Sequence, residues 1–288
     1  MIFETNYKNR PAVAISNDIL AAVFLPFDGA KMVSLKTADG IEMLEQAKGK
    51  EYKRLFIDTD YAAAECSGFD DMFPTIDPCV IGNFEYPDHG EACRIEHKCT
   101  IEENSISFEA QIKSVNSEIH KKIYTFGDVL NIDYVIKNRN PFELPYIWAG
   151  HMMFAGEKGA YVTENFPEGI QKTIMFGKVP EEMNILGEYS PAGESYKYYY
   201  NDENNALECG IVYPEWKKQL MLSFDGKAVK YLGIWMNNGS FKKMYNIALE
   251  PCTAPFDSPV NALRDGKSSV IPPKGSVSFT VKLKIKNI

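Results

Sequence analysis

The chain has 288 residues, of which 45% are hydrophobic and 24% are charged, and its formal net charge is −8. This is an ordinary globular composition, and the acidic balance disfavours nucleic acid or an anionic membrane as a partner, because no basic field would attract one. No run of about 18 apolar residues predicts a membrane span, and the N-terminus lacks signal-peptide features. The six cysteines have no paired short spacing, which favours reduced thiols and a cytoplasmic location.

Short strands separated by turns dominate the predicted secondary structure. In chain order the predicted strands cover residues 19–26, 31–35, 41–44, 105–112, 122–126, 129–137, 206–213, 219–224, 231–236 and 276–286. They carry alternating or continuous apolar residues, and glycine, proline, asparagine or aspartate separates many of them. Residues 45–65 predict a short helix or a long loop. Residues 257–264 predict one short helix, capped by Asp257 or Ser258.

Many short strands with turn residues between them predict an all-β fold. No change of composition and no flexible linker divides the chain. We therefore expect a single domain over residues 1–288, built as a large antiparallel β-sandwich of two packed sheets.

The stretch of residues 146–154 is almost wholly apolar but carries His151 in its middle. A histidine in such a strand-like run is dry enough to have a shifted pKa, which suits an acid–base catalyst. The alternative is a core histidine that is hydrogen-bonded to a backbone carbonyl.

Two other stretches place reactive groups at turns. His89 lies between Asp88 and Gly90, which predicts a loop that presents the imidazole; alternatively, Asp88 only caps the turn and His89 is exposed. Glu250 precedes Pro251, which predicts that it ends a strand. A partly buried carboxylate there is a candidate general base, and a surface glutamate is the alternative.

Adjacent aspartates and tryptophans give weaker signals. The side chains of Asp70 and Asp71 point to opposite faces of an extended chain, so we expect no metal site from them. Trp148 lies near His151, and Trp235 precedes the Glu250 strand. Their rings would suit stacking on a sugar, with core packing as the alternative.

Several short motifs occur in a defined order along the chain. They cover residues 29–35, 72–76, 88–90, 138–154, 233–235, 248–251 and 271–276. Their shared order resembles the galactose mutarotase-like superfamily, which includes the aldose 1-epimerases, over most of the chain. The sequence departs from that pattern where Met152 follows His151, a place where the family often has proline, and Arg94 lies one place later than in many relatives.

The resemblance implies a two-sheet β-supersandwich that interconverts the α and β anomers of an aldose without a cofactor or a metal. It implies that Glu250 is the general base, that His151 is the general acid, and that His89 stabilises charge near the ring oxygen. The expected sugar contacts are Trp148, Trp235, Asp71, Asp88 and Arg94. A neutral aldose is favoured over a phosphosugar, because no cluster of arginine or lysine is evident.

Other functions remain open at this stage. A non-catalytic carbohydrate-binding protein of the same fold would keep the tryptophans without needing Glu250. A glycosidase would need a second carboxylate facing Glu250, and the sequence offers no convincing one. In each case we expect a small-molecule sugar as ligand and a monomer or a homodimer.

Overall fold

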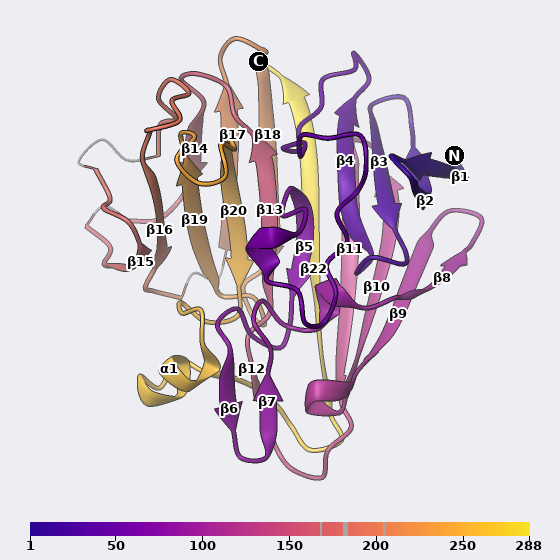
Figure 1. The fold of residues 1–288 in the computed structure, drawn as a ribbon, viewed down its shortest axis with the longest axis vertical. Helices are drawn as coiled ribbons and strands as arrows, with labels where there is room; N and C mark the ends of the chain where they lie inside the picture. Colours follow the sequence, from indigo (N-terminus) through magenta and orange to yellow (C-terminus); the bar gives the residue numbers. More distant parts are fainter. Residues whose placement is uncertain (168, 181–183, 204–205) are drawn as a thin grey trace.

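The computed structural model describes residues 1–167, 169–180, 184–203 and 206–288, and nearly all of its regular structure is β-strand. Two large antiparallel sheets pack against each other around a shared apolar core (Figure 1). This β-sandwich confirms the predicted fold class. No helix within the described residues is long and apolar enough to cross a membrane.

The first sheet has ten strands among the described residues, in the order β1-β2-β3-β4-β5-β13-β20-β19-β16-β15. Their bounds are β1 Ile2–Tyr7, β2 Arg10–Ser16, β3 Leu20–Leu25, β4 Lys31–Thr37, β5 Gly68–Met72, β13 Ala149–Ala155, β15 Lys172–Phe176, β16 Ser195–Tyr200, β19 Tyr231–Asn237 and β20 Asn246–Cys252. Strands distant in sequence thus become neighbours at the middle of this sheet, where β13 lies between β5 and β20.

The second sheet has eight strands among the described residues, in the order β14-β17-β18-β22-β11-β10-β9-β8. Their bounds are β8 Lys98–Ile101, β9 Ile106–Ile112, β10 Ser117–Phe126, β11 Val129–Asn138, β14 Tyr161–Glu164, β17 Ala206–Tyr213, β18 Lys218–Asp225 and β22 Ser276–Asn287. The smaller elements are β6 Cys79–Ile81, β7 Phe84–Tyr86, β12 Leu144–Tyr146, β21 Ser269–Ile271, the helix α1 Pro259–Arg264 and the 3-10 turns η1 Tyr61–Ala63, η2 Ala92–Arg94 and η3 Lys113–Val115.

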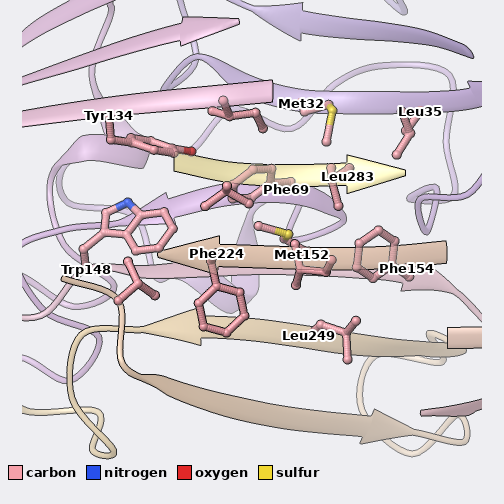
Figure 2. Packing of buried hydrophobic residues seen from close by; sticks show 14 of the residues in the cluster. Met32, Leu35, Phe69, Tyr134, Trp148, Met152, Phe154, Phe224, Leu249 and Leu283 are labelled. Carbon is pink, nitrogen blue, oxygen red and sulfur yellow. The ribbon is translucent and has the colours of Figure 1, made fainter. Parts of the chain in front are cut away.

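The main core lies between the two sheets. Because side chains alternate along a strand, Met152 and Phe154 of β13 and Leu249 of β20 point into this core (Figure 2). His151 and Glu250 alternate with them and therefore face the other side of the ten-stranded sheet. A loop carrying η1 crosses in front of β5 and β13 on that side (Figure 1).

Most of the predicted strands are present, and the predicted helix is confirmed as α1, with Ser258 as its N-cap. Residues 45–65 form a loop that contains η1. Residues 41–44 make only isolated bridges rather than a strand, so that prediction was wrong. The patterns did not predict β1, β2 or β16, and β16 carries a buried lysine in its interior, which breaks the usual alternation.

The strand that carries Glu250 does not end at Pro251, as the sequence predicted. β20 stays paired with β19 through Pro251 and Cys252. β20 pairs with β13 at Cys252 and at Leu249, but the two residues between them have no partner on β13. Proline has no N–H to donate, so the ladder with β13 is interrupted opposite Gly150 and His151 while the strand continues.

Candidate active site

A cavity of about 250 Å³ lies on the face of the ten-stranded sheet that carries His151 and Glu250. The strands contribute His151, Lys197, Trp235, Asn246 and Glu250 to its lining. Loops and the 3-10 turn contribute Tyr61, Asp77, Asp88, His89 and Asp257. The fold therefore gathers the three expected catalytic residues, together with Trp235 and Asp88, around one cavity.

His151 and Glu250 face each other across the interrupted ladder. The register at Ala149–Cys252 and Met152–Leu249 sets them opposite, and Nε2 of His151 lies 3.5 Å from Oε2 of Glu250. Their exposed fractions are 4% and 1%. Neither ring nitrogen of His151 has a hydrogen-bond partner among the described residues, so the alternative of a carbonyl-bonded core histidine is wrong, as is that of a surface glutamate.

Burial shifts the two groups in opposite directions. It lowers the pKa of His151 well below its ordinary value, and the charges of Lys197 and His89 act in the same direction. Burial raises the pKa of Glu250, and the adjacent Lys197 opposes that rise. The pair therefore consists of an imidazole that resists protonation and a carboxyl that resists ionisation. Because the ordinary pKa of histidine lies above that of glutamate, these two shifts move the pKa values of the pair toward each other, and the two groups titrate as a coupled pair.

Lys197 connects Glu250 to a second buried carboxylate. Its Nζ lies 2.9 Å from Oε2 of Glu250 and 2.8 Å from Oδ1 of Asp257, and the hydroxyl of Tyr199 donates to the same Asp257 oxygen at 2.7 Å. Burial alone would lower the pKa of Lys197, but Asp257 and Glu250 outweigh it, and the net pKa is raised. The ammonium group therefore stays charged beside the candidate base.

His89 is held by contacts on several sides. Its Nδ1 lies 2.9 Å from Oδ1 of Asp88, and its ring stacks on Tyr61 with centroids 4.1 Å apart. The ring also meets that of His151 edge-on at 5.6 Å. Burial raises the pKa of Asp88, but the hydrogen bond from His89 and its charge outweigh this and lower it. His89 is thus packed into the cavity wall rather than free in solvent.

The loop around His89 depends on Gly90 and Arg94. Gly90 has a φ of +71°, and a Cβ there would lie 2.4 Å from the carbonyl oxygen of Phe73. The guanidinium of Arg94 donates to the backbone oxygens of Asp88 at 2.6 Å and Gly90 at 3.0 Å. Arg94 is 6% exposed and does not line the cavity, so its expected sugar contact is corrected to a structural role in this loop.

Asp71 and Trp148 also lie away from the cavity, which corrects their expected sugar contacts. Asp71 points between the two sheets, where it accepts hydrogen bonds from Lys121 at 2.8 Å and Tyr134 at 2.7 Å. The indole N–H of Trp148 donates to the same carboxylate at 3.2 Å. Sequence spacing placed Trp148 near His151, but Trp148 packs in the core between the sheets (Figure 2), whereas His151 lines the cavity on the other face.

Trp235 forms one wall of the cavity. Its ring centroid lies 5.5 Å from that of Phe176 and 5.4 Å from that of Phe241. Its indole N–H donates to Oδ1 of Asn246 at 3.1 Å. Sequence reasoning assigned no role in a site to Lys197, Asn246, Asp257 or Tyr61, because strand order and loop packing bring them to the cavity. Among the described residues, no group of three or more His, Cys, Asp or Glu side chains could hold a metal ion.

Comparisons with known proteins place this geometry in a known fold. Neither a family model nor a curated protein sequence matches the chain. Among solved structures, a candidate aldose 1-epimerase from Klebsiella pneumoniae superposes with a TM-score of 0.76 at 15% identity, over 98% of this chain and 81% of that one. A galactose mutarotase-like protein from Clostridium acetobutylicum superposes with a TM-score of 0.69 at 18% identity, over 100% of this chain and 99% of that one. A galactose mutarotase-like protein from Lactobacillus casei superposes with a TM-score of 0.70 at 16% identity, over 96% of this chain and 100% of that one. The chain therefore has the galactose mutarotase-like fold.

Proposed function

We propose that the protein interconverts the α and β anomers of a neutral aldose, with Glu250 as general base and His151 as general acid. The observation that most supports this is the convergence of Glu250, His151 and His89, from three separate segments, on one cavity with an aromatic wall. The likeness to candidate aldose 1-epimerases supports the same reaction class.

The reaction needs one proton removed and one proton supplied. Glu250 takes the proton of the C1 hydroxyl, the O–H electron pair forms the C1 carbonyl, and the bond from C1 to the ring oxygen breaks. The ring oxygen receives a proton from the imidazolium of His151. After rotation about the C1–C2 bond, the reverse transfers close the ring on the other face and restore both residues, so no cofactor is consumed.

The surroundings of the pair suit these roles. Lys197 favours the ionised form of Glu250, which is the form that accepts a proton. A histidine with a low pKa is a strong acid once protonated, which helps donation to a weakly basic ether oxygen. His89 lies beside His151 and carries the Asp88 carboxylate on its other side, so its imidazole is placed to hydrogen-bond the ring oxygen and stabilise the negative charge that develops there as the bond to C1 breaks.

The charge of the cavity favours a neutral sugar. Asp77, Asp88, Glu250 and Asp257 line it, and Lys197 is already paired with two of these carboxylates. These carboxylates would repel a phosphate or carboxylate on the sugar. The described lining residues include no lysine or arginine besides the paired Lys197 that could bind such a group. Lys197 forms an ion pair with both Glu250 and Asp257, which disfavours these two carboxylates as the acid and the nucleophile of a glycosidase.

Anomer exchange measured by NMR on a panel of neutral aldoses tests the proposal. We expect the native protein to accelerate exchange above the spontaneous and buffer-catalysed rate. Glu250→Gln should lower kcat by about 10²–10⁴-fold, the usual contribution of a general base. Glu85→Gln, an exposed change on β7, is the matched control and should retain activity.

Two results would contradict the proposal. If no sugar is exchanged faster but its resonances shift on binding, a non-catalytic carbohydrate-binding protein is the better account. If Glu250→Gln exchanges anomers as fast as the native protein, Glu250 is not the base.

A further inference from the structure

Asn246 is a buried polar residue of the cavity that the proposed reaction does not use. It is 1% exposed, and its Oδ1 accepts the hydrogen bond from the indole of Trp235. An indole N–H can only donate, so the amide oxygen must be the atom that faces Trp235 and the amide nitrogen must face elsewhere. That nitrogen has no hydrogen-bond partner among the described residues. Such a buried, unpaired donor is costly to keep unless a ligand or water satisfies it.

Asn246 is too far along the strand to belong to the catalytic subsite. Asn246 and Glu250 lie on the same face of β20, four residues apart, which separates their backbones by about 13 Å at the usual strand rise. A single pyranose ring whose C1 lies between Glu250 and His151 is shorter than this, hydroxyl groups included. Both residues nevertheless line the same cavity.

An aromatic wall fills the interval between these two residues. Trp235 is paired with Ala248, which lies midway between Asn246 and Glu250 on the same face of β20. Phe176, which is 51% exposed, packs against Trp235 and marks where this end of the cavity meets solvent. Aromatic faces beside a polar donor suit the apolar face and the hydroxyl rim of a sugar ring.

We propose that Trp235 and Asn246 form a second sugar subsite, and that the substrate is a neutral disaccharide or longer oligosaccharide with a free reducing end. The reducing unit occupies the Glu250 end, which rests on the proposed function. The next unit stacks against Trp235, and one of its oxygens accepts a hydrogen bond from the Asn246 amide. The remainder of a longer chain leaves past Phe176.

The test compares sugars that share a reducing unit. Glucose is measured against maltose, cellobiose and lactose, each with anomer exchange by NMR for kcat/KM and with calorimetry for binding. We expect at least one disaccharide to have a kcat/KM about tenfold above that of glucose, the size of one added hydrogen bond. Asn246→Asp keeps the acceptor for Trp235 and removes the donor, and it should abolish this ratio. Asn83→Asp, on an exposed turn, is the matched control and should keep it.

The outcomes separate this inference from the proposed function. Exchange of glucose as efficient as that of every disaccharide overturns the second subsite and leaves the epimerase intact. If no sugar is exchanged but a disaccharide binds more tightly than glucose, and both Asn246→Asp and Trp235→Leu remove the difference, the subsite stands and the reaction is overturned. If no sugar is bound or exchanged, both are overturned.

Discussion

Replacing Lys197 with methionine tests the electrostatic account of the site most directly. The change keeps an unbranched side chain of similar length but removes the ammonium group that lies 2.9 Å from Glu250 and 2.8 Å from Asp257. Both carboxylates then lose their buried cation. The proposed base should become harder to ionise, because Lys197 is the main influence that lowers the pKa of Glu250.

The expected magnitude follows from burial. Leaving one side of a buried ion pair without its partner costs roughly 3–5 kcal/mol. At about 2 °C per kcal/mol for a chain of this size, Tm at pH 8 should fall by about 6–10 °C. Each pKa unit by which Glu250 rises corresponds to about 1.4 kcal/mol, and it moves the acidic limb of the kcat/KM profile to higher pH by the same amount.

The pH dependence gives the sign of the effect. A carboxyl group whose pKa is higher in the folded state than in the unfolded state takes up protons on folding, so folding gains stability as the pH falls through the folded pKa. In the Lys197→Met protein the Tm deficit should therefore be largest near pH 8 and smaller near pH 5, because the raised pKa of Glu250 brings its protonation toward that pH.

Lys121→Met is the matched control. Lys121 forms an equally buried pair with Asp71 at 2.8 Å, but between the sheets and away from the cavity. It should lower Tm to a similar degree while the pH profile of kcat/KM stays in place. Calorimetry at pH 5 and pH 8, with anomer exchange across the same range, measures both effects. An equal Tm loss at both pH values in Lys197→Met, with an unmoved acidic limb, would refute the reasoning.

Three further predictions concern separate parts of the site. The proposed mechanism needs ionised Glu250 and protonated His151, so kcat/KM should be bell-shaped with its maximum on the acidic side of pH 6.5; a plateau extending to pH 8 would exclude His151 as the donor. Gly90→Ala should cost at least about 1 kcal/mol in the free energy of unfolding, from its positive φ and the contact with Phe73, and should lower kcat/KM; calorimetry and kinetics check this. Trp148→Phe removes the indole donor to Asp71, so it should lower the free energy of unfolding by about 1–3 kcal/mol and leave KM unchanged. A raised KM would indicate that Trp148 contacts the sugar after all.

Much of the fold was predictable because the hydrophobic pattern of many strands is simple. β22 alternates over its whole length, and Gly127 and Asp128 join two strands in a two-residue hairpin. The pattern failed where function or packing broke it. β16 hides Lys197 between tyrosines, and Pro251 looks like a strand end although β20 continues through it.

The reactive residues of the site were easier to predict than the residues that support them. His89, His151 and Glu250 carry chemistry that a reader can recognise one residue at a time, and the order of short motifs implied their roles. Lys197 and Asp257 are 60 residues apart in sequence, and their meeting depends on β16 lying beside β19 in the sheet and on the loop after β20. No local pattern encodes that neighbourhood, so sequence spacing could not find it.

The strand β5 explains how the sandwich core and the site depend on each other. Its adjacent aspartates point to opposite faces, as the alternation of an extended chain requires. Asp71 binds Lys121 between the sheets, whereas Asp70 binds Lys31 and accepts a hydrogen bond from the Tyr61 hydroxyl on the cavity side. Because the ring of His89 stacks on Tyr61, the position of a candidate catalytic histidine depends on a buried carboxylate that does not line the cavity. Neither aspartate lines the cavity, and together they fix one wall of it to the core.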